Sequence, residues 1–115
     1  MMRRPTDTTD LYSWWQKALA GEPVAYHESH PECGFYRTRD RIAYREYGPW
    51  IPVSILLHSP IGDDGFLDGD ETFIAWRDGV QVDPDDVWVW CCRSPISEED
   101  YELLCFERAM EKEFA

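Results

Sequence analysis

The spacing of hydrophobic and polar residues predicts a helix near the start of the chain. From residue 8 to residue 21 the apolar side chains recur every three or four positions, the repeat of one helix face; they are Leu11, Trp14, Trp15, Ala18 and Leu19. Thr9 or Asp10 can cap the first turn, because their side-chain oxygens accept hydrogen bonds from its free N–H groups. Gly21 suits the end of the helix, and Pro23 prevents its continuation. We expect the aromatic stripe to belong to the core.

The middle of the chain has the two-residue alternation of β-strands. Residues 35–39 alternate in this way, and residues 41–48 can pair with them or extend them. Residues 49–60 are apolar and β-branched between prolines. Pro52 indicates an edge strand or the start of a strand, since it has no N–H to donate. Residues 71–83 predict a hairpin, whose central Asp-Gly pair fits a type I′ turn.

A short helix is predicted over residues 83–95. Asp83 can cap it, and Pro84 suits the first helical position. The alternating Val and Trp residues at 87–90 would equally suit a strand.

The strongest helical pattern lies in residues 95–114. Ser97 and Asp100 form a pair resembling a capping box, and the acidic first turn complements the helix dipole. The apolar residues line one face, which Leu104 and Cys105 widen; they are Leu103, Phe106, Met110 and Phe114.

These elements predict an α+β fold in a single domain of residues 1–115. We expect an N-terminal helix, a three- to four-stranded antiparallel sheet and a C-terminal helix, with a short helix possible before the last one and with the helices on one sheet face. Residues 1–8 read as an unstructured tail. At 43% hydrophobic residues the chain can form a core without disulfides or a structural metal.

Charge is distributed unequally. The net charge is −12, and residues 58–115 carry all of it, with four Lys/Arg against sixteen Asp/Glu. Such a surface repels nucleic acid and attracts cationic partners, although it could equally serve solubility alone. No apolar run reaches the roughly 18 residues of a membrane span, and the start of the chain does not fit a secretory signal. We therefore expect a cytoplasmic protein with reduced cysteines, no membrane contact and no direct nucleic-acid contact.

Residues 61–71, IGDDGFLDGDE, concentrate five of the acidic residues. An EF-hand loop is excluded, because position 3 of the loop, which must supply an oxygen ligand, would be Gly65 or Phe66. The glycines fit turns between two strands, so the carboxylates are expected to extend an interaction surface, with cation binding as a minor alternative. Together with two later clusters, the candidate partner-binding residues are Asp63, Asp64, Asp68, Asp70, Glu71, Asp83, Asp85, Asp86, Glu98, Glu99 and Asp100.

Three other functions, namely zinc binding, nucleophilic catalysis and single-strand binding, have less support in the sequence. His27, His30 and Cys33 could bind zinc with Cys91, Cys92 or Cys105, but the spacing lacks a second tight ligand pair. A Cys–His nucleophile pair lacks the surrounding motifs of a catalytic site, and we find no nucleotide-binding loop. The basic and aromatic residues could stack single-stranded bases; they are Phe35, Tyr36, Arg37, Arg39, Arg41, Tyr44, Arg45 and Tyr47.

The order of several short motifs resembles a group of small, uncharacterised proteins encoded in phages and prophages of proteobacteria. The motifs are WWQKALAG, PECGFYRTR, WIPVSI, GFLDGDE, WVW and PISEEDY, and they span nearly the whole chain. The resemblance implies a phage accessory protein and assigns no catalytic residue. Members of the group often lack histidines at positions 27 and 30, which lowers the weight of a zinc site.

Taken together, these features predict a non-catalytic protein, with no cofactor and no metal, that binds other proteins. The leading hypothesis is an anti-CRISPR-like inhibitor whose acidic surface occupies the basic nucleic-acid-binding groove of a host defence protein. An accessory module in phage DNA replication or recombination is the first alternative, and a small zinc-binding protein is the second. Aromatic content beyond the needs of a core also allows a homodimer.

Overall fold

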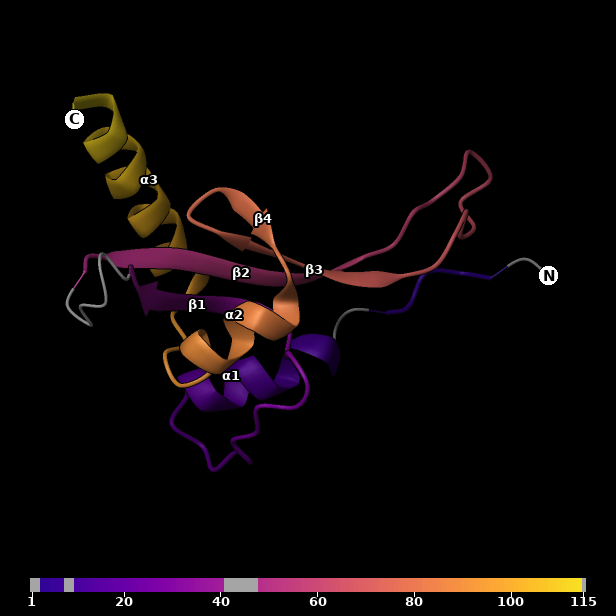
Figure 1. Ribbon diagram of the computed structural model, residues 1–115. Helices are drawn as coiled ribbons and strands as arrows, with labels where there is room; N and C mark the ends of the chain where they lie inside the picture. Colours follow the sequence, from indigo (N-terminus) through magenta and orange to yellow (C-terminus); the bar gives the residue numbers. More distant parts are fainter. Residues whose placement is uncertain (1–2, 8–9, 41–47, 115) are drawn as a thin grey trace.

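A computed structural model describes residues 3–7, 10–40 and 48–114. The sheet has four antiparallel strands in the order β1-β2-β3-β4, so neighbours in sequence are neighbours in space (Figure 1). The fold class is the predicted α+β. The elements in chain order are a 3-10 turn at Asp10–Tyr12, α1 (Ser13–Leu19), β1 (Gly34–Arg39), β2 (Trp50–His58), β3 (Thr72–Arg77), β4 (Val80–Val82), α2 (Pro84–Cys91) and α3 (Glu98–Phe114).

One face of the sheet forms the core with α2. Tyr36 of β1 and Val53 of β2 are paired across the strands, and both are fully buried. Trp88 of α2 packs edge-on against Tyr36, with ring centroids 5.4 Å apart. Trp15 of α1 closes the end of this core and donates its indole N–H to the carbonyls of Phe35 and Ile96. Of the stripe predicted for the core, Trp15 is buried and Trp14 is half-buried against the same core, whereas Leu19 is 41% exposed.

The opposite face is covered by α3. Phe35, which points away from Tyr36 by strand alternation, packs against Tyr101 of α3 at a centroid distance of 4.8 Å. The expectation that all helices lie on one sheet face is therefore wrong. The sequence of β2 explains the difference, because residues 51–55 are buried without interruption and such a run needs cover on both faces.

Pro52 is the third residue of β2, a central strand, so of the two predicted positions the sheet edge is wrong and a place near the start of the strand is what the structure has. The Asp78 N–H donates to the Pro52 carbonyl at 2.9 Å, and an ordinary residue would return a hydrogen bond to the Asp78 carbonyl. Proline cannot do so. The ammonium group of Lys112 donates to that carbonyl instead, at 3.1 Å, so a side chain of α3 replaces the missing ladder bond.

Most of the predicted turns and caps are present. Asp78 and Gly79 both have positive φ (52° and 83°), as a type I′ turn requires. Asp83 accepts from the Asp85 N–H at 2.9 Å, and Ser97 accepts from the Asp100 N–H at 3.1 Å. The first helix differs, because α1 begins only at Ser13 after a 3-10 turn. Asp10 therefore does not cap it, and Thr9 lies outside the described residues.

Residues 41–47, which the sequence assigns to a strand partner of β1 and to the basic patch, also lie outside the described residues.

Candidate functional site

The acidic loop between β2 and β3 is a small secondary hairpin at one end of the molecule (Figure 1). Ile61 and Leu67 form an antiparallel bridge, and the Asp64 carboxylate accepts from the Phe66 N–H at 3.0 Å. The exposed Asp63 and Asp64 form its tip. The loop is thus a turn that carries carboxylates, and its hydrogen bonds are those of turn geometry.

Glu71, at the base of this loop, is engaged within the protein. Its carboxylate accepts from the hydroxyl groups of Ser59 (2.7 Å) and Thr6 (2.8 Å). These hydrogen bonds, Ser59 first, hold the pKa of Glu71 below its usual value. The Arg3 carbonyl also accepts from the Leu67 N–H at 2.7 Å. Glu71 therefore anchors residues 3–7, part of the expected unstructured tail, beside the loop.

The remaining acids of this loop are open to a partner. Asp68 is exposed, and Asp70 lies 3.8 Å from the exposed Arg3. Such a surface ion pair contributes little to stability.

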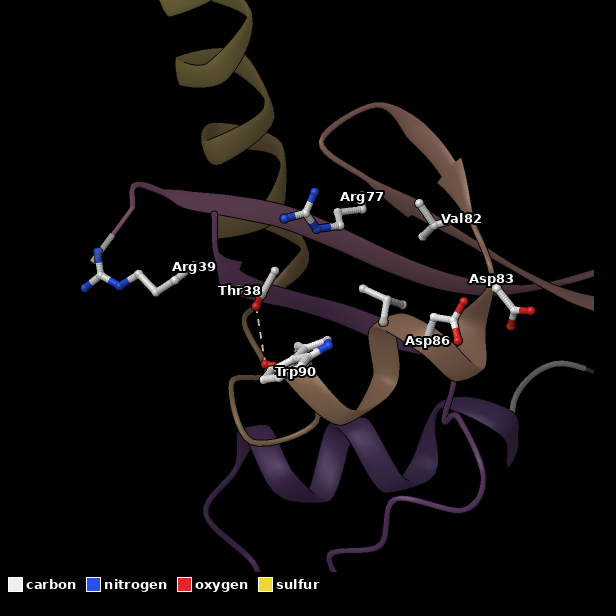
Figure 2. Close-up of a pocket in the computed structure, with 8 residues that line it drawn as sticks. Thr38, Arg39, Arg77, Val82, Asp83, Asp86 and Trp90 are labelled. Carbon is white, nitrogen blue, oxygen red and sulfur yellow. Dashed lines mark hydrogen bonds between the residues drawn. The ribbon is translucent and has the colours of Figure 1, made fainter. Parts of the chain in front are cut away.

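The second acidic cluster begins α2 and borders a cavity of about 330 Å³ (Figure 2). Asp83 and Asp86 lie on one side of it, and Arg77 and Arg39 lie on the others. Arg77 is paired with Asp40 at 3.3 Å. This cavity contains both signs of charge, so Asp83 and Asp86 do not form a uniformly negative face, whereas the exposed Asp85 lies outside the lining.

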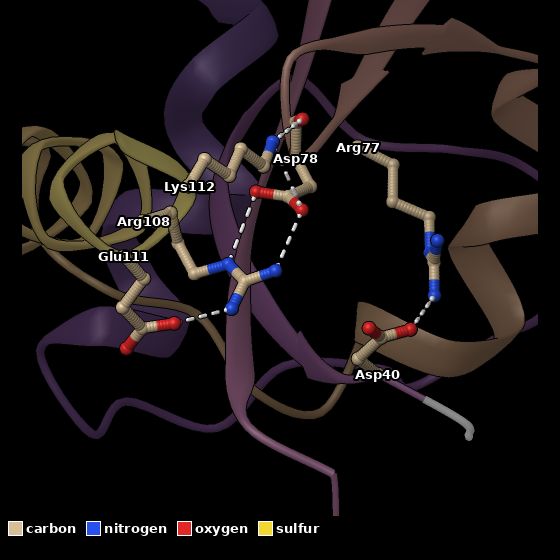
Figure 3. Close-up of polar contacts among 6 residues, drawn as sticks. All are labelled: Asp40, Arg77, Asp78, Arg108, Glu111 and Lys112. Carbon is tan, nitrogen blue, oxygen red and sulfur yellow. Dashed lines mark hydrogen bonds and ion pairs between the residues drawn. The ribbon is translucent and has the colours of Figure 1, made fainter. Parts of the chain in front are cut away.

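The third cluster belongs to α3, and the structure adds to it a feature that the sequence analysis did not find. The two cationic residues of α3, Arg108 and Lys112, both reach the turn between β3 and β4 (Figure 3). Arg108 donates twice to the Asp78 carboxylate, at 2.9 and 3.2 Å, and Lys112 lies 3.3 Å from it. The Arg108 hydrogen bonds hold the pKa of Asp78 below its ordinary value. Arg108 also pairs with Glu111 at 2.6 Å.

Because both cations turn toward the sheet, the outward side of α3 carries carboxylates. These are the exposed Glu98, Glu99, Asp100, Glu102, Glu107 and Glu113. Three of them were predicted as partner-binding residues. The others were missed, although the acidic composition of the last helix was visible in the sequence.

The apolar face of α3 is also different from the expected one. Leu103, Phe106 and Met110 are 56%, 63% and 37% exposed, so this stripe faces solvent. The side chain of Phe114 lies outside the described part. The residues that face the sheet form a second series at helical spacing, which is Tyr101, Leu104, Cys105 and Arg108. The Phe35–Tyr101 and Asp78–Arg108 contacts select this second series.

The three acidic clusters do not form one continuous site. The loop of residues 61–71 projects at one end of the molecule, and α3 ends at the other (Figure 1). The first turn of α3 follows α2 by a short connection but lies on the opposite sheet face. A small partner could therefore contact only one of these surfaces at a time, and only a large partner could contact several.

The described residues of the predicted basic and aromatic patch do not form an open surface on which bases could stack. Tyr36 is fully buried, and Phe35 is covered by Trp15 and Tyr101. The guanidinium groups of Arg37 and Arg39 lie 4.2 and 3.9 Å from the centre of the Trp50 ring.

The candidate zinc ligands are not gathered. Among the described residues no group of three or more His, Cys, Asp or Glu could hold a metal ion. Cys33 and Cys91 are buried thiols in the core region, and burial raises the pKa of Cys33 to about 11. Cys105 sits on α3, across the sheet from Cys91. His27 instead contacts Glu32 at 3.2 Å.

No helix in the described ranges is long and apolar enough to cross a membrane. Comparisons of the chain with protein-family models, with curated proteins and with solved structures give no match.

Proposed function

We propose that this protein is a phage-encoded inhibitor that acts by binding, and that its target is a host defence protein with a basic nucleic-acid-binding groove. The observation that carries the proposal is the separation of charge on α3. Arg108 and Lys112 are bound to Asp78 on the sheet side, so the outward side is negative. The net charge of −12 strengthens this field.

The physical basis is competition with phosphates. A groove that binds DNA or RNA is lined with Lys and Arg, and its affinity depends on neutralising phosphate charge. Exposed carboxylates on a folded surface supply the same sign of charge, and complementary fields speed association. The residues available for this role are the tip and edge of the 61–71 loop, Asp85, and the first turns of α3. The resemblance to phage proteins supports the biological setting.

A displacement assay tests the proposal. Bacterial RNA-guided nuclease complexes are loaded with labelled target duplex, and the protein is titrated in while bound DNA is followed by gel shift. We expect displacement from at least one complex. Because salt also weakens DNA binding, the electrostatic contribution is measured separately, as the affinity of the protein for the DNA-free complex, which should fall as salt rises from about 50 to 200 mM. An affinity for the DNA-free complex that is independent of salt would contradict an electrostatic mechanism.

Matched charge variants make the assay specific. Asp63→Lys/Asp68→Lys and Glu102→Lys/Glu107→Lys each change the net charge by the same amount as Glu22→Lys/Glu28→Lys, whose positions are exposed in the neutral half of the chain. At least one of the two variants with lysines in the acidic half should displace DNA less well than Glu22→Lys/Glu28→Lys. Equal displacement by all three would refute a localised acidic interface. Capture of a phage replication or recombination protein, with no effect on any defence complex, would favour the alternative function.

A further inference from the structure

The outward face of α3 combines an apolar stripe with two acidic borders. Leu103, Phe106 and Met110 follow one another at three- and four-residue intervals, so they lie in one line along about 10 Å of helix. Their exposure of 37–63% is unusual for three adjacent large apolar side chains on a helix that already packs on a sheet.

The acidic borders follow from the same helical geometry. Asp100, Glu107 and Glu111 share one side of the stripe, because they are seven and four residues apart. Glu102 and Glu113 share the other side, being eleven residues, or about three turns, apart. All five are exposed.

One border is the wall of a groove of about 420 Å³ between α3 and the sheet. Asp100, Glu107 and Glu111 line the helix side, and Pro49 and Trp50 line the sheet side, with Leu103 at the rim. Arg37 and Arg108 also line this groove: Arg37 lies over the Trp50 ring, and Arg108 is paired with both Asp78 and Glu111. Glu111 is therefore partly neutralised, and Asp100 and Glu107 carry most of the negative charge on this side. The groove therefore presents an apolar floor beside a row of carboxylates.

We propose that this face of α3 is the docking surface for a basic amphipathic segment of the partner. Apolar side chains of that segment would lie on Leu103, Phe106 and Met110, while its Lys or Arg side chains would meet the two acidic borders. The inference rests on the proposed function for the cationic nature of the partner. It adds that binding has an apolar anchor, as central contacts of stable interfaces usually do.

Charge argues against a second copy of this chain as the occupant. Both borders of the stripe are acidic, so any pairing of two α3 helices through the stripe brings carboxylates against carboxylates. Like charges opposed in an interface cost several kcal/mol. A basic partner meets attraction on both sides instead.

A designed peptide provides the probe. It is a helical peptide of about 20 residues, long enough to span α3, with leucines along one stripe and lysine and arginine on both sides. A control peptide carries serine in place of each leucine at the same charge. Binding of both peptides is measured by fluorescence anisotropy, with Phe106→Gln compared against Val80→Gln. Val80 is 64% exposed on β4 and Phe106 is 63% exposed, so the two substitutions remove equally exposed apolar side chains.

We expect the leucine peptide to bind the parent protein at least about tenfold more tightly than the serine peptide. Phe106→Gln should remove that difference, and Val80→Gln should retain it. Thermal unfolding of Phe106→Gln should match that of the parent, because the side chain is exposed. The apolar docking surface would be overturned if the parent protein bound the two peptides equally well, or if Phe106→Gln and Val80→Gln lost the same affinity for the leucine peptide.

Charge variants separate this inference from the proposed function. Glu102→Lys/Glu107→Lys should weaken binding of the leucine peptide at least about tenfold. Asp63→Lys/Asp68→Lys changes the net charge by the same amount and should leave this binding unchanged. If both weaken it equally, the docking surface is refuted while a general electrostatic role survives. If light scattering shows a dimer of the parent that Phe106→Gln dissociates, a second copy is the occupant and the inference is wrong.

Discussion

Replacing Asp78 with Asn should destabilise the protein through its contacts with α3. Asn tolerates positive φ, so the turn between β3 and β4 is preserved. The substitution removes a two-point ion pair between Asp78 and Arg108. The side chain of Arg108 is only 14% exposed and that of Asp78 only 18%. Hydrogen bonds to charged groups contribute about 1.5–3 kcal/mol, and the exposed Lys112 adds little. We therefore expect a loss of about 2 kcal/mol of unfolding free energy at pH 7.

The loss should depend on pH with a defined sign. Arg108 lowers the pKa of Asp78 in the folded protein below 3.8, so the contribution of Asp78 is fully present above that value. It disappears as pH falls through the folded pKa, because the carboxylate is then protonated in both states. The stability difference between parent and Asp78→Asn should accordingly be constant near neutral pH and shrink below about pH 4.

Urea unfolding followed by tryptophan fluorescence measures this difference, with Asp63→Asn as a control. Asp63 is exposed at the loop tip, so its substitution should change stability by less than about 0.5 kcal/mol. A double-mutant cycle with Arg108→Gln isolates the pair, and the two losses should not add. If Asp78→Asn unfolds at the same urea concentration as the parent, or if the two losses are additive, α3 is not fastened to the sheet by this pair.

Three other predictions follow from local contacts. Gly34→Ala should lower the free energy of unfolding by more than about 2 kcal/mol, measured by urea unfolding, because the new Cβ would lie 2.3 Å from the Trp15 ring. Glu71→Gln should speed amide hydrogen exchange in residues 3–7 at pH 7, where the parent carboxylate is ionised and accepts from Thr6 and Ser59; unchanged exchange would show that this anchor is unimportant. Cys33, whose pKa is about 11, should react with a thiol reagent at pH 8 only after unfolding, as mass spectrometry of the labelled peptide would reveal.

The features that the sequence predicts correctly are determined over a few residues. Asp83 caps α2 through the N–H of Asp85, and the Asp78–Gly79 pair makes the hairpin turn. In each case the side chain or glycine acts on backbone next to it, so the pattern alone is sufficient. The helix over 83–95 is settled in the same way, since the cap outweighs the alternation of Val and Trp.

The incorrect predictions involve partners that are distant in sequence. Pro52 is tolerated in a central strand because the Lys112 side chain, which follows it by sixty residues, takes the carbonyl that proline leaves unpaired. The orientation of α3 has a similar origin. Its sequence contains two series at helical spacing, and the one that is buried contacts residues far away in sequence, Phe35 on β1 and Asp78 in the turn after β3. No local pattern contains that information.

The acidic residues show why net charge alone could not locate a site. Glu71 binds the N-terminal segment, Asp78 holds α3, and Asp83 caps α2, so three carboxylates are used to build the fold. The same contacts shape the remaining surface. Arg108 lies on the sheet side of α3 by its helical position, and its pairing with Asp78 holds that positive charge away from Leu103 and Phe106, which lie between carboxylates. The residue that fastens α3 to the sheet thus also positions the helix whose outward face we propose for binding, and Asp78→Asn should weaken both stability and binding.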